Sequence, residues 1–517
     1  MNPVPVLSAA EAALWDRNAR TQHQIPSRVL METAGRAVAA VALREFPEVA
    51  RRGALVVAGA GNNGGDGWVL ARALHALRVP VWVAGLDPKT DDGVANRALA
   101  RLDGVPEVGE GEPWPAAALL IDAVLGTGAT GPARGDVLAL TQKMAAYGAP
   151  VLAVDGPTGL DLSSGDAHGP LRAQVTVTFG GPRRGHLLAR EWCGKIVVVD
   201  IGFPPADPAW PVLVTDHWAG GTLPPLEPRM HKGDRGRVTV IGGAAGMSGA
   251  ALHAARAALA AGAGLVKLIA GPETIAAARA SLPDVLTVES KLAGGLEPAA
   301  VEAVEWADAL VIGPGLGRDP VRRGVLKASL ELRPIPTVVD ADALTLWEGT
   351  APATDRESFR GSRLTVFTPH LGEFRAVLGD QLADEVANDR WNAAARAAQQ
   401  LSGTVLLKGV PTVIAGVSGP AHVVASGNPG LATGGSGDLL AGFIGAFLAR
   451  GLPPVAAAAL GAHALGRAAE QGARDWTARS LRPADVLASL PAVWRAWRDA
   501  GPSVPPVLVT LDAPETA

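Results

Sequence analysis

Short apolar runs alternate with longer amphipathic or Ala-rich stretches along most of the chain. In the first half, six runs rich in Val, Ile and Leu end in Gly-rich turns, at residues 54–61, 79–86, 119–128, 150–159, 174–181 and 194–202. Apolar runs of this length are typical of strands that are buried on both faces of a parallel sheet. Helical stretches such as residues 67–78 separate several of them. The alternation predicts a doubly wound α/β domain.

The alternation stops between residues 203 and 236, which are rich in Pro and polar residues and show no period. It then restarts, with seven apolar runs at 237–243, 264–271, 308–317, 336–344, 363–370, 404–409 and 411–416 and an apolar helix expected at 439–450. We therefore predict two tandem three-layer α/β/α domains. They cover residues 1–222 and 223–500, and a loosely held tail follows at 501–517.

Composition and charge exclude several classes of protein. Although Gly (63) and Pro (41) are frequent among the 517 residues, the hydrophobic fraction of 48% is that of a globular protein. A net charge of −4 without a basic arm argues against binding to nucleic acid. A single cysteine excludes a disulfide framework. The N-terminus does not resemble a signal peptide, and no uncharged apolar run reaches the ~18 residues of a membrane span, so we expect a cytoplasmic protein without a membrane partner.

The loop after the first apolar run has unusual chemistry. Residues 59–64, Gly-Ala-Gly-Asn-Asn-Gly, formally match a dinucleotide-binding fingerprint. However, Asp66 follows where the helix is expected to start, and its charge would repel a pyrophosphate at that position. Asn62 and Asn63 would instead present oxygens to a cation or to hydroxyl groups. An N-cap role for Asp66 is the alternative.

Further polar groups are expected at the same edge of the first sheet. They are Asp122, the loop from Gly126 to Pro132, and Asp155. Buried carboxylates at strand ends are costly unless they are paired or bind a metal. The oxygens of Asn63, Asp122 and Thr158 suit K⁺ or Mg²⁺ better than zinc. Their convergence predicts a site, and separate turn-capping roles are the alternative.

In the second half, a Gly-rich loop from Asn428 to Asp438 precedes an apolar helix. Its glycines allow several backbone N–H groups to point at one anion, and the helix dipole adds to the attraction. Asp438 would lie in the first turn, where it can accept a proton from a hydroxyl that attacks a phosphate. Lys408 and Gly409 would supply a cation and a close backbone approach for a diphosphate. A plain Gly-rich loop capped by Asp is the alternative.

His370 and Glu373 lie on a loop after another predicted strand. A lone His-x-x-Glu lacks the further ligands that a zinc site needs. We interpret His370 as a substrate contact, with a hydrogen-bonded structural histidine as the alternative.

Motifs in both halves resemble a known pair of enzymes. GAGNNGGDGWVLAR, DAVLGTGATGP and VDGPTGLD resemble the NAD(P)H-hydrate epimerases. HKGDRGRVTVIGG, GPGLG, DADAL, TPHLGEF, LKGVPTVIAG and NPGLATGGSGDLLAG resemble the ADP-dependent NAD(P)H-hydrate dehydratases. The resemblance covers nearly the whole chain except the tail. It implies a Rossmann-like epimerase domain fused to a ribokinase-like dehydratase domain.

The resemblance also implies a reaction. Hydration of NAD(P)H at a ring carbon beside the nitrogen gives two epimers, R and S, of NADHX or NADPHX. The first domain would interconvert the epimers, and the second would dehydrate the S epimer while ADP becomes AMP and phosphate. Phosphorylation of the hydroxyl, with Asp438 taking its proton, creates a good leaving group that the ring nitrogen can expel. We expect a homo-oligomer that binds these small molecules.

Site residues follow from the resemblance, position by position. In the epimerase, Asp155 would be the acid/base and K⁺ would lie on Asn63, Asp122 and Thr158. The hydrate would contact Asn62, Asn63, Gly64, Gly65, Asp66, Gly126, Thr127, Gly128, Ala129, Thr130, Gly131, Pro132 and Asp155. In the dehydratase, which would also use Mg²⁺, the hydrate would contact Ala250, Gly315, His370 and Asp438. ADP would contact Lys408, Gly409, Val410, Pro411, Thr412, Asn428, Thr433, Gly434, Gly435, Ser436 and Gly437.

Two positions depart from the family pattern. Thr158 stands where the family usually has Ser, which preserves the hydroxyl ligand. Arg183 stands where the family usually has Lys, and a guanidinium stays protonated and cannot transfer a proton. The epimerase would therefore depend on Asp155 or run slowly.

Other functions compete with this interpretation. The main alternative is a ribokinase-type small-molecule kinase fused to a non-catalytic Rossmann-like binding module. An NAD-dependent dehydrogenase is a third possibility. The sequence alone does not distinguish NADHX from NADPHX, or ADP from ATP.

Overall fold

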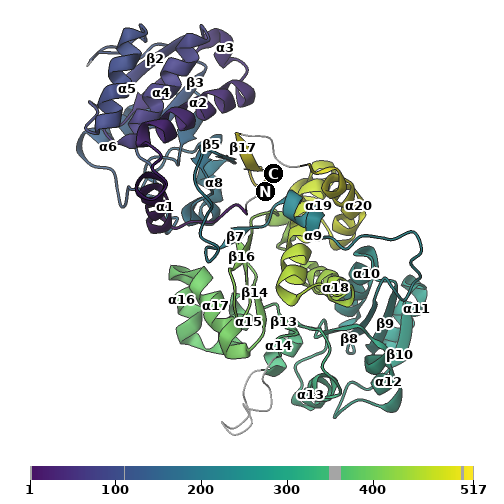
Figure 1. Ribbon diagram of the computed structural model, residues 1–517. Helices are drawn as coiled ribbons and strands as arrows, with labels where there is room; N and C mark the ends of the chain where they lie inside the picture. Colours follow the sequence, from purple (N-terminus) through teal and green to yellow (C-terminus); the bar gives the residue numbers. More distant parts are fainter. Residues whose placement is uncertain (1–2, 110, 348–361, 502–505, 516–517) are drawn as a thin grey trace. The chain divides into compact units, whose positions relative to one another are not determined.

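A computed structural model describes residues 3–109, 111–347, 362–501 and 506–515 (Figure 1). The chain forms two compact units, Met1–Trp210 with Pro502–Pro514, and Pro211–Gly501 with Glu515–Ala517. Both are α/β, as predicted. Within the described ranges, no helix is both long and apolar enough to cross a membrane.

The first unit is built on a seven-stranded sheet in the order β17-β6-β5-β4-β3-β1-β2. Six parallel strands form where the apolar runs predict them: β1 (Ala54–Ala58), β2 (Val81–Gly85), β3 (Leu119–Ala123), β4 (Val151–Val154), β5 (Val175–Phe179) and β6 (Lys195–Val199). The helices are α1 (Ala9–Thr21), α2 (Ser27–Glu45), α3 (Val49–Arg52), α4 (Asn62–Ala76), α5 (Asp91–Leu102), α6 (Gly135–Ala145), α7 (Arg184–Leu188) and α8 (Arg190–Cys193).

Alternate residues of β1 pack into two different cores. Val56 lies in a cluster with residues of α2, α4 and α5, whereas Leu55 and Val57 lie in a cluster with Met144 of α6. The sheet is therefore covered on both faces, which gives the predicted three layers. Because β1 lies between β2 and β3, the order of the strands reverses there, and ligands of such sheets bind near the loops that follow strands at this point of the carboxyl edge.

The C-terminal segment differs from its prediction as a loosely held tail. Residues Val507–Leu511 form β17, which pairs antiparallel with β6, from Val507 opposite Val199 to Leu511 opposite Ile196. The run Val-Leu-Val-Thr-Leu is short and rich in β-branched residues, and pairing satisfies the edge of β6, which would otherwise be exposed. The chain thus returns to the first unit after completing the second.

Removal of β17 is expected to destabilise the first unit. Deleting residues 506–517 exposes the edge of β6 and should lower the thermal midpoint of the first unit by about 5 °C. Scanning calorimetry measures the effect. A control that lacks only residues 514–517 keeps β17 and should behave like the full chain. Equal heat sensitivity of both truncated proteins would contradict a stabilising role for β17.

The second unit is built on a ten-stranded sheet in the order β10-β9-β8-β11-β12-β13-β14-β15-β16-β7. The strands are β7 (Val212–Leu213), β8 (Arg237–Ile241), β9 (Leu265–Ala270), β10 (Leu286–Glu289), β11 (Ala309–Ile312), β12 (Thr337–Val339), β13 (Thr365–Phe367), β14 (Thr404–Leu407), β15 (Thr412–Ala415) and β16 (His422–Val424). The strands from β10 to β14 in this order are parallel, and β15 turns back antiparallel. Because β7 pairs with β16, the boundary between the units falls after Trp210 rather than near residue 222.

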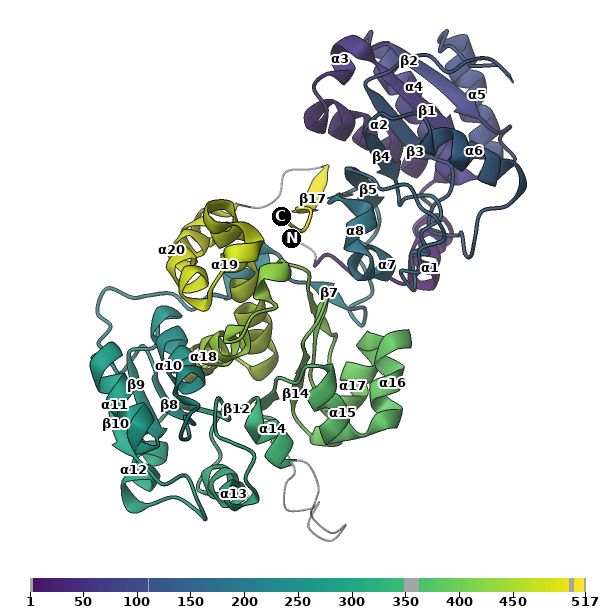
Figure 2. The same ribbon diagram turned by 180° about the vertical axis from the view of Figure 1, so that it is seen from behind.

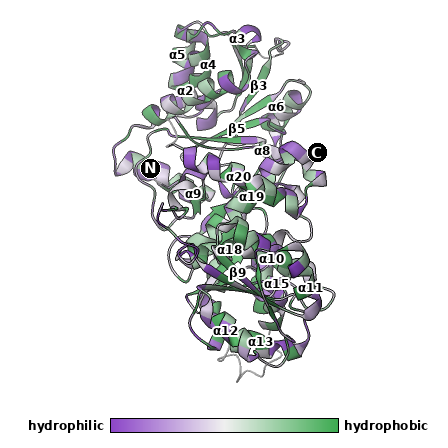
Figure 3. Ribbon diagram, turned by 90° about the vertical axis from the view of Figure 1, so that its right-hand side faces the viewer, coloured by the Kyte–Doolittle hydropathy of each residue, from purple (hydrophilic) through white to green (hydrophobic). Residues whose placement is uncertain are grey.

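Helix α18 (Ser436–Ala449) lies at the centre of the second unit's core. Every residue from Leu439 to Leu448 is buried, and the helix is coloured hydrophobic in Figure 3. It packs with α10 (Ser248–Ala260), α19 (Pro454–Ser480) and α20 (Pro483–Asp499) (Figure 2). The other helices are α9 (Asp216–Thr222), α11 (Pro272–Ser281), α12 (Pro298–Trp306), α13 (Arg323–Glu331), α14 (Asp342–Trp347), α15 (Leu371–Leu378), α16 (Asp380–Asn388) and α17 (Arg390–Leu401). The packing fixes the start of α18, where the predicted Gly-rich loop ends.

Candidate active sites

The polar residues predicted for the first unit gather at the carboxyl edge of its sheet. Residues 62–66 form the first turns of α4, and residues 126–132 connect β3 to α6. Asp122 lies within β3, and Asp155 follows β4 directly. Of the loop after β3, residues Gly128, Thr130 and Pro132 are exposed, whereas Gly126 and Thr127 turn toward Asp155.

Asp155 has a constrained backbone and a fully engaged carboxylate. Its φ of 63° lies in the left-handed region, which a non-glycine residue adopts at some cost, and its N–H donates to Val177 O at 2.7 Å. The carboxylate accepts hydrogen bonds from the backbone N–H of Thr127 (2.8 Å), the Thr127 hydroxyl and Thr178 Oγ1 (3.2 Å). A Cβ on Gly126 would lie 2.9 Å from Asp155 Oδ2, so a side chain there would displace the carboxylate.

Arg183 fixes the other side of Asp155. Its Nη2 lies 3.4 Å from Asp155 Oδ1, its Nε donates to Thr127 Oγ1 (3.0 Å), and its Nη1 donates to Gly181 O (2.6 Å). Burial alone would raise the pKa of Asp155, but the charge of Arg183 and the hydrogen bonds from Thr127 outweigh it and lower that pKa. Asp155 is therefore ionised, and the guanidinium that replaces the family's usual Lys acts as a fixed charge.

Asp66 has the opposite protonation behaviour. Its burial raises the pKa well above the usual value, and the negative charge of Asp155 raises it further. The N-cap of α4 is Gly61, without a side-chain hydrogen bond, so the alternative interpretation of Asp66 as a helix cap is wrong. The pKa values of these two neighbouring carboxyl groups are therefore shifted in opposite directions, that of Asp155 down and that of Asp66 up.

The residues predicted to hold K⁺ fit a cation site. Asp122 is fully buried; its Oδ1 accepts from Thr158 Oγ1 (2.7 Å), and its Oδ2 accepts from Thr158 N (2.8 Å). In the part of the chain that the structure describes, no basic side chain forms an ion pair with Asp122, and burial raises its pKa. Neither polar atom of the buried Asn63 amide has a hydrogen-bond partner among the residues that the structure describes. A buried carboxylate and an orphaned amide oxygen are the environment that an oxygen-preferring cation satisfies.

In the second unit, Lys408 directly follows β14, and its ammonium group lies near both Asp340 and the start of α18. Its Nζ lies 2.7 Å from Asp340 Oδ1 and 4.0 Å from Glu373 Oε2, and a Cβ on Gly437 would lie 3.4 Å from it. Burial would lower the pKa of Lys408, but the charges of Asp340 and Glu373 outweigh this effect and raise it. A charged ammonium thus lies beside the end of the Gly-rich loop.

Asp438 lies in the first turn of α18, as predicted. Its burial, together with the negative charge of Asp340, raises its pKa to about 7, although Lys408 opposes the shift. A carboxyl group with a pKa near neutral can both accept and release a proton at physiological pH.

The predicted ADP residues lie on two neighbouring segments. Lys408 to Thr412 join β14 to β15, where Val410 is exposed, Pro411 O accepts from Arg390, and Thr412 Oγ1 donates to Gly409 O (3.0 Å). Thr433, Gly434 and Gly435 lead into α18, and Ser436 Oγ donates to Thr433 O (3.1 Å). Asn428 is different, because its Nδ2 donates to Ala469 O and its Oδ1 accepts from Gly430 N, both at 3.0 Å.

The residues predicted to contact the hydrate in this unit fall in two places. Gly315 faces the start of α10, since a Cβ on it would lie 3.3 Å from the Cβ of Ala250. His370 caps α15: its Nδ1 accepts from Gly372 N (3.0 Å) and Glu373 N (3.3 Å). More than half of its side chain is exposed, and its Nε2 lies 3.4 Å from Glu373 Oε1.

Sequence reasoning did not assign Asp340 to the site. It is buried at the end of β12, and its Oδ1 accepts from Thr368 Oγ1 (2.6 Å) and from Lys408. The sequence signal was available: Asp340 and Asp342 directly follow an apolar run, and a carboxylate at the end of such a run was the reason for selecting Asp155. Asp342, the second of them, accepts from Gly317 N (2.9 Å) and Arg318 Nε (3.1 Å).

Both units are similar to known proteins. The family described as NAD(P)H-hydrate dehydratase matches residues 238–492, and the family described as YjeF-related protein N-terminus matches residues 27–185. A bifunctional NAD(P)H-hydrate repair enzyme, Nnr, from Moorella thermoacetica is 37% identical over 95% of this chain and 96% of its own length. The chain belongs to the bifunctional NAD(P)H-hydrate repair enzyme family. Nnr from Escherichia coli K12 is 35% identical over 89% of this chain and 88% of its own length.

The predicted family is therefore confirmed, and with it the pairing of an epimerase-type with a dehydratase-type domain. Among solved structures, an ADP/ATP-dependent NAD(P)H-hydrate dehydratase from Bacillus subtilis is 28% identical, with a TM-score of 0.48 over 55% of this chain and 97% of that one. Asp122, Asp155 and Arg183 lie in the first matched region of this NAD(P)H-hydrate repair enzyme, and Asp340, Lys408 and Asp438 lie in the second.

Proposed function

We propose that the first unit interconverts the R and S epimers of NADHX and NADPHX, and that the second dehydrates the S epimer while ADP becomes AMP and phosphate. The observation that carries the proposal is the group at the start of α18. There, Asp438 has a pKa of about 7 beside the Lys408–Asp340 ion pair and a run of Gly-rich backbone. This arrangement suits phosphoryl transfer to a hydroxyl group.

The dehydratase reaction has two stages. Asp438 accepts the proton of the hydrate's hydroxyl as its oxygen attacks the terminal phosphorus of ADP, and the bond from that phosphorus to the bridging oxygen breaks to release AMP. Backbone N–H groups of residues 434–437 and the ammonium of Lys408 stabilise the charge on the transferred group. The ring nitrogen then expels phosphate from the carbon. Loss of a proton from the neighbouring ring carbon restores the double bond of NAD(P)H.

Mg²⁺ would reach this site with the nucleotide. Among residues 3–109, 111–347, 362–501 and 506–515, no group of three or more His, Cys, Asp and Glu side chains could hold a metal ion. The carboxylate of Asp340 already accepts from Thr368 and Lys408, and that of Asp342 accepts from Gly317 N and Arg318. We infer that the phosphates of ADP supply most of the ligands of the metal.

The epimerase reaction inverts the hydroxyl-bearing carbon. Ionised Asp155 removes the hydroxyl proton, and protonated Asp66 gives a proton to the ring nitrogen as the carbon–nitrogen bond breaks, which leaves an open-chain aldehyde. Closure on the opposite face reverses both transfers and gives the other epimer. K⁺ on Asn63, Asp122 and Thr158 would supply a positive charge that balances Asp122. Arg183 holds Asp155 in place without exchanging protons.

The K⁺ site can be tested through stability as well as through activity. We expect KCl, compared with LiCl at equal ionic strength, to raise the thermal midpoint of the native protein by binding the folded state alone. Thr158→Val removes the hydroxyl ligand and should abolish that difference and lower epimerase activity about tenfold. Thr141→Val, which removes a hydroxyl bonded to Leu138 O on α6, is the matched control. A K⁺-specific shift that survives Thr158→Val would contradict the assignment.

The products distinguish the dehydratase from a kinase. With S-NADPHX and ADP, we expect one phosphate and one AMP for each NADPH that forms, as measured by chromatography and absorbance. A stable phosphorylated nucleotide without recovery of NADPH would instead favour the ribokinase-type alternative.

A further inference from the structure

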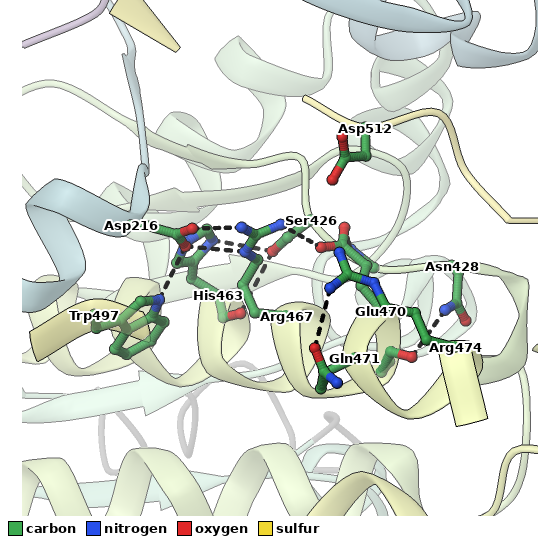
Figure 4. Close-up of polar contacts among 12 residues, drawn as sticks. Asp216, Ser426, Asn428, His463, Arg467, Glu470, Gln471, Arg474, Trp497 and Asp512 are labelled. Carbon is green, nitrogen blue, oxygen red and sulfur yellow. Dashed lines mark hydrogen bonds and ion pairs between the residues drawn. The ribbon is translucent and has the colours of Figure 1, made fainter. Parts of the chain in front are cut away.

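A cluster of charged side chains lies beside Ser426 and Asn428, where the Gly-rich loop of the second unit begins (Figure 4). Its centre is the carboxylate of Asp216, at the start of α9. Oδ1 of Asp216 lies 2.9 Å from His463 Nε2, and it accepts from Arg467 Nε and Trp497 Nε1, each at 2.9 Å. Oδ2 accepts from Arg467 Nη2. Asp216 thereby joins α9, α19 and α20 at one point.

Two chains of hydrogen bonds lead from Asp216 to the residues that open the loop. In the first, Arg467 Nη1 donates to Glu470 Oε2 (2.6 Å), and Glu470 Oε1 accepts from the backbone N–H of Gly427 (2.8 Å). In the second, His463 Nδ1 lies 3.0 Å from Ser426 Oγ. The next residue, Asn428, is bonded to α19 through Ala469 O. Three consecutive residues, 426–428, are thus attached to α19.

The packing around this attachment allows little adjustment. A Cβ on Gly466 would lie 2.4 Å from Ser426 Oγ, so the chain approaches α19 as closely as a glycine permits. Burial would raise the pKa of Asp216, but His463 and Arg467 outweigh burial and lower it. Burial would lower the pKa of Arg467, but Asp216 and Glu470 outweigh it and raise it. Asp216 and Arg467 therefore stay charged across the neutral range.

We propose that Glu470 and Arg467, oriented by Asp216, are positioning residues that set the geometry of the nucleotide-binding loop at residues 428–437. The assignment rests on the proposed function, since it takes this loop as the ADP site. The carboxylate of Glu470 accepts from Gly427 N, and the side chain of Asn428 accepts from Gly430 N. Together they fix the start of the loop whose later glycines would contact the phosphates. Asp216 belongs to the stretch 211–222 that the sequence had assigned to the first domain.

The test is the effect of Glu470→Ala in the full chain on each substrate separately. We expect the KM and Kd for ADP to rise about tenfold, while the KM for the S hydrate and the epimerase activity stay unchanged. Glu470→Gln keeps an acceptor for Gly427 N–H and should restore most of the ADP affinity. Amide hydrogen exchange should show faster exchange at residues 427–437 in Glu470→Ala and not in Glu470→Gln.

Asp308→Ala is a matched control for the loss of an ion pair. Asp308 also accepts from a backbone N–H, that of Arg237 (2.9 Å), and also pairs with an arginine. It directly precedes β11, so it lies at the amino end of that strand and not at the carboxyl end. We expect it to lower stability without changing the Kd for ADP. If Glu470→Ala and Asp308→Ala lower stability equally and leave the Kd for ADP within twofold of native, the proposal is overturned. If the native chain binds no ADP by calorimetry, the proposed function fails and the loop assignment fails with it.

Discussion

Asp438→Asn is expected to lower kcat for dehydration of the S hydrate by about 10³-fold while ADP still binds. The amide fills the same space at the start of α18 but cannot accept the hydroxyl proton. It also removes a negative charge near Asp340, so the affinity for ADP should be equal or higher. Single-turnover recovery of NADPH measures the rate, and calorimetry measures ADP binding. The control Asp308→Asn is expected to leave both unchanged, and an Asp438→Asn protein with more than a tenth of the native kcat would refute the role.

The same carboxyl group predicts a pH profile. Because Asp438 must be ionised to accept a proton and its pKa is about 7, kcat/KM for dehydration should fall as the pH drops below 7. If the proton acceptor had the pKa of an ordinary surface aspartate, kcat/KM would not change until the pH fell to about 4–5. Measurement from pH 5.5 to 8.5 distinguishes the two. A flat profile over that range would show that Asp438 is not the proton acceptor.

Asp155→Asn is expected to lower the rate of epimerisation by about 10³-fold and to leave dehydration of the S epimer unchanged. The variant keeps most hydrogen bonds around residue 155 but loses the charge that accepts the proton and that pairs with Arg183. The rate is measured as the slow recovery of NADPH from the R epimer in the presence of ADP. Native dehydratase activity in the same sample is the internal control for folding.

A variant at Arg183 tests whether Asp155 and Asp66 are sufficient for the proton transfers of epimerisation. In Arg183→Lys, which restores the residue usual for the family, we expect epimerisation within about threefold of native, because Asp155 and Asp66 carry the protons. An increase of tenfold or more would show that the family's lysine has an acid/base role that Asp66 does not replace.

The sequence predicted the position of a polar residue correctly where that residue lies at the end of a predicted strand. The apolar runs around Asp122 and before Asp155 and Lys408 each form a strand with at least one parallel neighbour. The polar residue in the last positions of the strand or directly after it therefore lies toward the carboxyl edge. The Gly-rich loop before α18 followed from the same logic. The two α/β units, and the carboxyl edge of each sheet at which these polar residues lie, could therefore be predicted.

Features that depend on partners distant in sequence could not be predicted in this way. The five residues of β17 have no period of their own, and only pairing with the exposed edge of β6 makes them a strand. Likewise, the sequence predicted Val212–Leu213 to be part of a Pro-rich linker, and these residues form a strand only because they pair with β16. Arg183 could be identified as a departure, but its contacts with Asp155 and Thr127 depend on how three loops converge. The attachment of Gly427 to Glu470 joins residues on different elements and leaves no motif.

The central claim is that one chain carries both reactions, with a separate carboxylate for each. The most direct measurement follows NADPH recovery from an equal mixture of R- and S-NADPHX with excess ADP. For the native chain we predict complete recovery in two phases. For Asp155→Asn we predict a native first phase for the S half and a second phase about 10³-fold slower, and for Asp438→Asn we predict a first phase about 10³-fold slower. A second phase at the native rate in Asp155→Asn, or a first phase faster than a tenth of the native rate in Asp438→Asn, would contradict these assignments.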